Sequence, residues 1–459
     1  MSRLLFKFTA CAGSLALGIA ALATVSPAAS ATARIDHSPS KEHEAAGAKA
    51  ADCFWFGPTP RVDADQHNYA FPDTGALYWA AMFKLPKGAY LTFDHEYAHA
   101  RYQSLNTYNE ATNSPTDALN DVSTKPDRGS RNPYLPGAKR TSNAHRSYTA
   151  TLVGDQPPTD PADRATNTLY AGVPGQDHVT LLYRLYLPDR HTDPTGGAGL
   201  PRPALHLADG TTVTGADMCK VVEAEDRETL PLTRLPADTY DALRNQPGKP
   251  AGFPAERAPV WRAFYNQKFG LGCIYNGACS GTPLKTGGQF SNKDNEYVSA
   301  YVSREFGDVL VLRGKLPVTP ATTHRNPRMR SDAELRYWSI CTNETYATTR
   351  TVGCLYDEQI VTDADGRYTI VLSLPKDRPA NATPAHGVNW LSLSPNGDGA
   401  GHLDDTYVVL RNMLPSASFQ HSVQNTRVPG DERAVMGTYL PTGTYTTTKA
   451  FEADGGAAG

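Results

Sequence analysis

One ordered series of short motifs occurs twice in this chain. The first copy opens with "GAYL" at residues 88–91, and the second opens with "GDVL" at residues 307–310. The matched segments that follow, in one order but with unequal gaps, are Arg101-Tyr102-Gln103-Ser104 with Arg336-Tyr337-Trp338-Ser339, Leu119-Asn120-Asp121 with Leu355-Tyr356-Asp357, Tyr148-Thr149 with Tyr368-Thr369, Asn167-Thr168-Leu169 with Asn389-Trp390-Leu391, and Arg184 and Pro188 with Arg411 and Pro415. An ordered set of this kind indicates two copies of one module.

Both copies consist of β-strand signals. Blocks such as "AYLTFDHEY", "VTLLYRLYLP", "RYTIVLSLP" and "TYVVLRNMLP" are rich in β-branched and aromatic residues, with Pro, Gly, Asn or Asp at their ends. The clearest helix signal is "PADTYDALRNQ" at residues 236–246, which opens with Pro236 and has Asp238 as a possible cap. We therefore predict a mainly β fold of two tandem antiparallel β-sandwich modules, jelly-roll-like, with a short and partly helical connector.

The chain start has the composition of a secretory signal. Arg3 and Lys7 precede a short apolar core, and Ala29-Ser30-Ala31 offers a small-residue cleavage site. We therefore expect a secreted protein. The predicted organisation is a signal peptide (1–31), a disordered segment (32–52), the first module (53–218), a connector with one short helix (219–287), the second module (288–442) and a flexible tail (443–459).

The cysteines agree with an exported chain. The sequence has seven, and loss of Cys11 with the signal leaves six, an even number that favours disulfides in an oxidising compartment. Six cysteines allow 15 pairings, so spacing alone does not decide among them. The pairing that we expect is Cys341–Cys354, Cys273–Cys279 and Cys53–Cys219.

The second copy resembles a known family. "RYWSICTNE", "GRYTIVLSLP", "NWLSLSP" and "TYVVLRNMLP" are similar to the strands of the domain-of-unknown-function 1214 family, with the clearest similarity over residues 336–415. Residues 88–188 form a more divergent copy, in which Gln103 and Thr168 stand in place of the two tryptophans of the pattern. The resemblance implies a jelly-roll sandwich and supplies no activity.

Charge and hydropathy restrict the possible partners. The formal net charge is −3, and no long run of Lys and Arg is present, so the sequence lacks the electrostatic signature of nucleic-acid binding. After the signal, no second stretch is apolar enough to span a bilayer. Carbohydrate or another small extracellular ligand is the partner that we expect.

The string His95-Glu96-Tyr97-Ala98-His99 matches the H-E-x-x-H motif of zinc peptidases. That motif works on a helix, where residues four apart lie on one face and both imidazoles reach one metal. Here the preceding alternation indicates a strand, and the usual third ligand is missing. We predict that neither histidine lies on a helix and that the protein carries no cofactor. The alternative is a divalent metal held by His95 and His99, with Glu96 as the catalytic base.

Four other residues are candidates for ligand binding. Arg101 and Arg336 could recognise an anion through their planar guanidinium groups. The structural alternative, which we favour, is that each pairs with Asp121 or Asp357 and joins neighbouring strands. In "NWLSLSPNGDGAGHLDD", Asn389 and Trp390 could bind a sugar, with Asp404 as a further hydroxyl partner, or Trp390 could fill the core.

Two functions remain open on the sequence. The first is a non-enzymatic extracellular protein that binds polysaccharide or cell-wall material or acts structurally. The second is an extracellular hydrolase, metal-assisted in one version, with its site near His95–Arg101 or between the modules. Fold alone does not separate them, so the site must decide.

Overall fold

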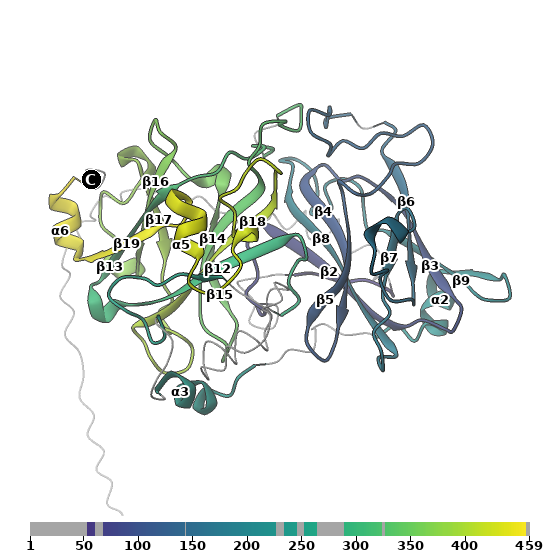
Figure 1. Ribbon diagram of the computed structural model, residues 1–459, viewed down its shortest axis with the longest axis horizontal. Helices are drawn as coiled ribbons and strands as arrows, with labels where there is room; N and C mark the ends of the chain where they lie inside the picture. The colour runs from purple at the N-terminus through teal and green to yellow at the C-terminus, as the bar shows by residue number, and fades with distance from the viewer. Residues whose placement is uncertain are drawn as a thin grey trace, which may run out of the picture. The chain divides into compact units, whose positions relative to one another are not determined.

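The protein is described by a computed structural model over residues 53–59, 68–142, 144–225, 234–245, 252–263, 289–323 and 326–455. Over these residues it is mainly β, as predicted, and contains four sheets (Figure 1). The first sandwich has one sheet of strands β1 (Phe56–Thr59), β2 (Ala76–Lys84), β8 (His178–Pro188), β4 (Ala100–Asn109) and β5 (Ser114–Asn120), in that order. Its other sheet has the order β10 (Thr212–Thr214), β9 (Arg202–His206), β3 (Tyr90–Glu96), β6 (Ser147–Val153) and β7 (Thr168–Tyr170).

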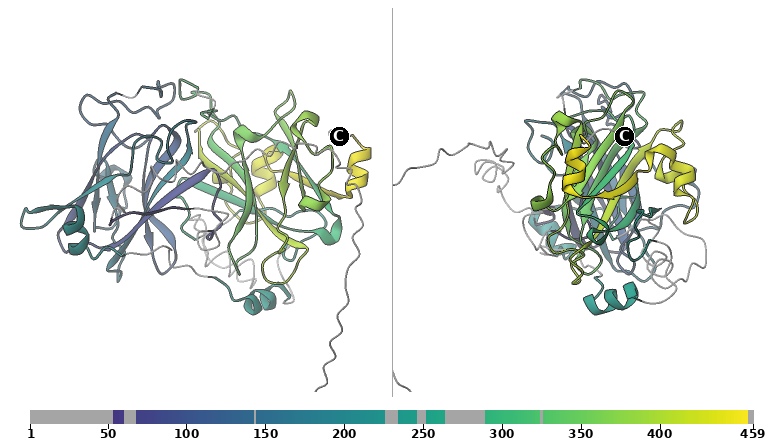
Figure 2. Two further views of the ribbon diagram at one scale, coloured as in Figure 1. Left: turned by 180° about the vertical axis from the view of Figure 1, so that it is seen from behind. Right: turned by 90° about the vertical axis from the view of Figure 1, so that its left-hand side faces the viewer.

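The second sandwich repeats this arrangement. One sheet has the order β11 (Arg262–Ala263), β12 (Asn295–Ser303), β18 (Asp405–Pro415), β14 (Leu335–Asn343) and β15 (Thr351–Tyr356). The other has the order β17 (Val388–Ser392), β16 (Arg367–Ser373), β13 (Val309–Lys315) and β19 (Thr442–Thr446). Figure 2 shows both sandwiches from behind and from one end.

Short helices occupy the connections. In the described ranges the α-helices are α2 (Gly215–Val221), α3 (Ala237–Asn245), α5 (Glu432–Met436) and α6 (Thr448–Ala453). The single-turn 3-10 helices are η2 (Pro161–Asp163), η4 (Arg304–Phe306), η5 (Asp357–Gln359), η6 (Pro375–Asp377), η7 (Pro384–His386), η8 (Val423–Asn425) and η9 (Gly437–Tyr439). Helix α3 confirms the helix predicted at residues 236–246. Within the described part of the chain, no helix combines the length and apolar character that crossing a membrane requires.

Strand order and register both confirm the duplication. Ser104 pairs with Arg184 between β4 and β8, as Ser339 pairs with Arg411 between β14 and β18. Since the spacing from Arg101 to Ser104 equals that from Arg336 to Ser339, all four arginines take equivalent places. The copies also share a departure from a purely antiparallel fold, because β6 pairs with β7, and β16 with β17, in parallel.

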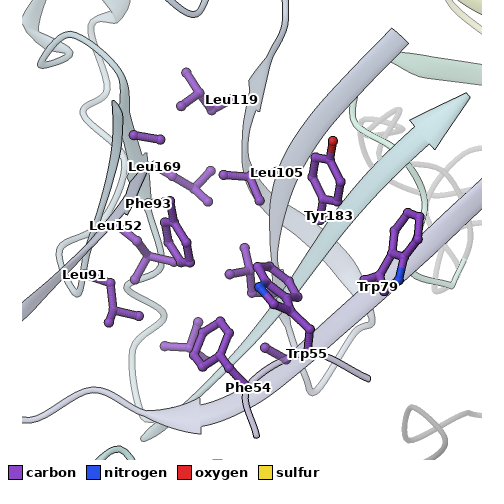
Figure 3. Packing of buried hydrophobic residues seen from close by; sticks show 14 of the residues in the cluster. Phe54, Trp55, Trp79, Leu91, Phe93, Leu105, Leu119, Leu152, Leu169 and Tyr183 are labelled. Carbon is purple, nitrogen blue, oxygen red and sulfur yellow. The ribbon is translucent and has the colours of Figure 1, made fainter. Parts of the chain in front are cut away.

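Each sandwich encloses its own apolar core. In the first, Phe93, Leu105, Leu152 and Tyr183 are among the buried side chains that meet between the two sheets (Figure 3). Trp338 is fully buried in the corresponding core of the second sandwich. Burial of such rings and branched side chains supplies the main stabilisation of each module.

The two sandwiches also pack against each other, through the sheets that contain β8 and β18. On β8, Leu181 and Leu185 lie in the first core, whereas Tyr186 alternates to the opposite face and contacts Tyr337 of the second sandwich at 5.2 Å between ring centroids. A strand that is buried on both faces needs apolar or aromatic residues at successive positions. This explains why "VTLLYRLYLP" lacks the alternation of a half-exposed strand.

Two predicted segments differ from the structure. The predicted flexible tail from residue 443 is wrong, because β19 pairs with β13 from Thr442 to Arg313 through Thr446 to Val309 and α6 follows (Figure 1). β19 can add to this edge of the sheet because β13 pairs with β16 along its other edge only. Residue 219, assigned to the connector, lies in α2, whose Met218 and Cys219 are buried in the first core.

Two of the three expected disulfides are present. Cys53–Cys219 joins the start of the first sandwich to α2, and Cys341–Cys354 links β14 to β15 across paired positions. The third expected pair, Cys273–Cys279, lies outside the described residues.

Candidate functional site

The H-E-x-x-H string is divided between two sides of one strand. His95 and Glu96 are the last residues of β3, so their side chains point to opposite faces of the sheet. His95 is buried in the first core, and Glu96 is exposed. His99 follows in the short turn before β4 begins at Ala100. Neither histidine lies on a helix, as predicted, and the string does not present two imidazoles to one point.

His95 has a structural environment. Its Nε2 lies 3.1 Å from the Tyr183 hydroxyl, and the rings of Tyr148 and Tyr183 pack against it edge-on. Burial lowers the pKa of His95 to about 3, and the nearby charge of Arg202 acts in the same direction. The imidazole is therefore neutral at physiological pH and serves as a hydrogen-bonding member of the core.

Glu96 and His99 belong to a polar pocket on the first sandwich. The pocket is open to solvent and measures about 820 Å³, with Asp189, Arg190 and His191 also in its lining. The His99 backbone is held on both sides, since its N–H donates to Gly196 O (2.9 Å) and its carbonyl accepts from Asp189 N–H (2.8 Å). Glu96 and His99 fall within the stretch His95–Arg101, one of the two places that the sequence offered for the alternative hydrolase site, although His95 and Arg101 are not in the pocket's lining.

Arg101 and Arg336 exchange partners across the two sandwiches. Arg101, from the first sandwich, is fully buried and donates from Nη1 to both carboxylate oxygens of Asp357 in the second (3.1 and 3.0 Å). Its Nη2 bonds Glu358, and its Nε donates to Thr322 Oγ1 (2.7 Å). These contacts use its donors within the protein, so the residue fastens the modules together.

Arg336 makes the reciprocal contact. Its Nη1 donates to Asp121 Oδ1 of the first sandwich (3.1 Å), and its Nη2 donates to Tyr134 O (3.1 Å). Burial raises the pKa of Asp121 to about 6, and the Arg336 guanidinium opposes that rise. The sequence predicted pairing with Asp121 or Asp357, and the structure shows that each arginine takes the carboxylate of the other copy.

Asn389 and Trp390 are engaged in the second module. The Asn389 side chain donates to the carbonyls of Val361 and Thr369 and accepts from Val361 N–H, at 2.9 to 3.0 Å. Arg378 lies over the Trp390 ring, with its guanidinium carbon 4.5 Å from the ring centroid, and the indole N–H donates to Ser373 Oγ. One face of the proposed sugar platform is therefore already covered.

The loop around His402 is a second place where ligating side chains gather. Donor atoms of Asp398, His402 and Asp405 lie within 4.8 Å of one another. However, His402 bonds Asp398 through Nδ1 (2.6 Å) and Asp241 of α3 through Nε2 (2.9 Å), and Arg244 bonds Asp405 (2.7 Å). The cation beside Asp405 opposes metal binding, so this network is better explained as the attachment of α3.

A cavity between the sandwiches is the remaining candidate. Its walls come from the central sheets of both modules, and its lining is mostly apolar and aromatic. The described lining residues include Tyr69, Phe71, Tyr78, Ala80, Leu182, Arg184, Tyr186, Phe290, Tyr297, Tyr407, Val409 and Arg411. It measures about 80 Å³. Aromatic walls with a few polar groups are typical of small-molecule sites.

Two equivalent arginine–tyrosine pairs face this cavity. Tyr78 pairs with Arg184 between β2 and β8, and Tyr297 pairs with Arg411 between β12 and β18. The guanidinium carbon lies over the paired ring in both cases, at 4.7 Å for Tyr78 and 5.7 Å for Tyr297. Sequence reasoning had matched the arginines but missed the tyrosines. The signal was available in "ALYWAA" and "NEYVSA", where the tyrosine occupies the same place.

Comparisons with known proteins add little to this site. No family model matches the chain, and no curated protein matches it. An uncharacterised protein from Burkholderia cenocepacia is 13% identical, with 87% of this chain and 84% of that chain covered, at a TM-score of 0.45. A protein from Vibrio parahaemolyticus is 12% identical, with 79% and 90% covered, at a TM-score of 0.37. Similarity at this level says nothing about function.

Proposed function

We propose that this protein is exported and binds a small ligand in the cavity between its two sandwiches. The observation that carries the proposal is the lining of that cavity, in which aromatic rings and two guanidinium groups surround a partly open space. Rings bind apolar or flat ligand surfaces, and a guanidinium supplies directional donors. The proposal develops the expectation of an extracellular binding protein.

Rigid elements hold the groups that line the cavity. Arg184 and Arg411 lie on β8 and β18, the central strands of the two facing sheets. The exchanged ion pairs of Arg101 and Arg336 join the two sandwiches. Binding groups on strands that are packed on both faces lose little freedom when a ligand arrives, which favours affinity.

The size of the cavity limits the ligand. A volume of about 80 Å³ holds roughly half a dozen water molecules. A small molecule, or the terminal unit of a cell-wall chain, fits such a space, whereas an extended length of polymer does not. The expectation of polysaccharide binding is therefore narrowed to a single terminal unit.

Export has its own test. Cys53–Cys219 and Cys341–Cys354 fit an oxidising compartment. We expect the mature protein to begin near Thr32 and to contain no free thiol. N-terminal sequencing and thiol titration of the denatured, unreduced protein would check both expectations, and two or more free cysteines would contradict export through an oxidising compartment.

Ligand binding can be tested with two substitutions in different places. Ala80 is buried and lines the cavity, so Ala80→Leu should fill part of the space and abolish binding of any ligand found by thermal-shift screening. Glu96→Gln, in the polar pocket of the first sandwich, is the matched control and should bind as the unmodified protein does. Equal binding by both variants and the unmodified protein would place the site elsewhere.

The alternative is a hydrolase in the polar pocket. It is favoured by one observation, the presence of Glu96, Asp189, His99 and His191 around an open space of about 820 Å³. Carboxylates and imidazoles are the groups that perform general acid–base catalysis. Under this alternative, Glu96→Gln would abolish turnover of a cell-wall substrate, while Ala80→Leu would leave it intact.

A further inference from the structure

One equivalent position, next to the lining residues Pro72 and Ser291, holds Asp73 in the first copy and Asn292 in the second. Each lies just before the strand that carries the cavity tyrosine, and each carbonyl accepts a turn hydrogen bond, from Ala76 N–H (3.1 Å) and from Asn295 N–H (3.0 Å). Each Oδ1 also accepts from a tyrosine of the other sandwich, Tyr337 (2.9 Å) for Asp73 and Tyr102 (3.0 Å) for Asn292.

In one half, the aspartate provides the arginine with a counter-charge. Asp73 Oδ2 lies 3.7 Å from Arg411 Nη1 and accepts from the Ser339 hydroxyl (2.6 Å). Arg411 also donates from Nη2 to Phe71 O (2.6 Å). The positive charge of Arg411 is therefore compensated within the protein.

In the other half, the aspartate is replaced by a neutral amide. Asn292 is buried, and its Nδ2 has no hydrogen-bond partner among the described residues. The carboxylate two residues along, Asp294, is bonded to the Tyr102 hydroxyl (2.6 Å) and the Asn120 amide (3.0 Å). The symmetry of the fold would put a carboxylate near Arg184 at this position. The chain instead has the amide N–H donor of Asn292 there.

Arg184 is consequently a buried cation without an ion pair in the described structure. It is 3% exposed, its Nε and Nη2 donate to the Tyr108 hydroxyl (3.2 and 2.6 Å), and its Nη2 also donates to Phe290 O. All of these acceptors are neutral, and its Nη1 has no acceptor among the described residues. An arginine cannot shed its proton, so its burial without an anion is costly.

We propose that the ligand supplies this missing charge and is a small carboxylate, held by Arg184 with its apolar body against the cavity rings. The inference rests on the proposed function, because it assigns the ligand class of the same cavity. A guanidinium donates charge-assisted hydrogen bonds to a carboxylate. The apolar rings around it favour a ring-shaped or hydrocarbon body over a heavily hydroxylated one.

A carboxylate ligand has two sources outside the cell, a free aromatic acid or an acidic sugar of the cell wall. Calorimetric titration of the full mature protein with benzoate, glucuronate and the neutral benzyl alcohol, at one ionic strength, separates them. We expect benzoate to bind at least tenfold more tightly than benzyl alcohol, and more tightly than glucuronate. Tighter binding of glucuronate would still support the carboxylate and would assign it to the sugar source.

The decisive variant is Asn292→Asp, which restores the counter-charge found in the other half. It should weaken benzoate binding at least tenfold and raise the ligand-free melting temperature, because Arg184 gains an internal partner. Gln420→Glu adds the same charge at an exposed position and should bind as the unmodified protein does. If Asn292→Asp fails to fold, Arg184→Met serves instead and should remove the preference for benzoate over benzyl alcohol.

The possible failures are distinct. The carboxylate inference would be overturned if benzyl alcohol bound as tightly as both acids, or if a folded Asn292→Asp variant bound the acids unchanged. Either result would leave the proposal of a ligand-binding cavity intact. The proposed function and the inference would both be overturned by two results together. Neither the acids nor the alcohol would bind, and Ala80→Leu would behave as the unmodified protein does in the thermal-shift screen.

Discussion

The two repeated arginine pairs lie in the same interface but differ in their electrostatic surroundings. Arg101 and Arg336 each bond a carboxylate of the other sandwich, and Arg101 bonds two. Of the cavity pair, Arg411 has a carboxylate nearby at 3.7 Å, and Arg184 has only neutral acceptors in the described structure. Repetition alone therefore does not separate a structural arginine from a binding one. Under the proposal made above, the absence of an internal counter-charge distinguishes the binding arginine.

The largest effect that this comparison predicts is for Arg101→Met. Removing the arginine leaves Asp357 and Glu358 buried without their cation, which should lower the free energy of unfolding by about 3–5 kcal/mol. Urea denaturation followed by circular dichroism measures the change. Arg330→Met, which breaks an exposed pair with Asp332, is the matched control and should cost under about 1 kcal/mol. A similar small cost for Arg101→Met would remove the distinction between the pairs.

Arg336→Met should show a loss that depends on pH. The pKa of Asp121, about 6 with Arg336 present, should rise further without that cation. A carboxyl group whose folded pKa is raised contributes stability below its unfolded pKa and loses that contribution as pH rises through the folded pKa. The variant should therefore lose about 3 kcal/mol at pH 8 and less at pH 5, as measured by urea denaturation at both values. An equal loss at both pH values would contradict the role of Asp121.

His95 sharpens the comparison because it is buried without a carboxylate, as Arg184 is, but can release its proton. Its folded pKa of about 3 lies below the unfolded value, so its contribution is present above about pH 6.5 and is lost as pH falls toward about 3. At about 1.4 kcal/mol per pH unit, roughly 2–3 kcal/mol should be lost between pH 6.5 and pH 4.5. His95→Gln should flatten this slope, and the exposed His386→Gln is the control. Parallel slopes in all three proteins would contradict the assignment.

The smallest predicted effect is for Arg184→Met without ligand. An unpaired buried cation contributes little to stability, so its replacement by an apolar side chain should change the free energy of unfolding by under about 1 kcal/mol, or increase it. Denaturation in ligand-free buffer, compared with Arg101→Met, measures the contrast. A loss as large as that of Arg101→Met would mean that Arg184 is a structural residue and that its tyrosine and carbonyl contacts suffice.

Patterns in the sequence were enough to predict the repeat, the strand-rich fold and the helix near residue 240. The strands and the helix depend on side-chain periodicity and turn residues, which neighbouring residues largely determine. The two disulfides that are present were expected from the cysteine count and a choice among 15 pairings, and Cys53–Cys219 joins residues 166 apart. The divided H-E-x-x-H string followed from the same reasoning, since alternation along β3 sends His95 and Glu96 to opposite faces. The tail prediction failed because β19 is held by a strand more than a hundred residues earlier, which no local pattern reveals.

Only the tertiary structure decided which carboxylate each arginine meets and which arginine meets none. The spacing from Arg101 to Asp121 differs from the spacing from Arg336 to Asp357. Each aspartate bonds the arginine of the other sandwich. The difference between Asp73 and Asn292 is visible in the sequence, but it acquires meaning when the two sheets bring each residue to the partner copy's tyrosine. Packing two large sheets face to face is a long-range event, and the energy of a buried charge depends on what that packing places beside it.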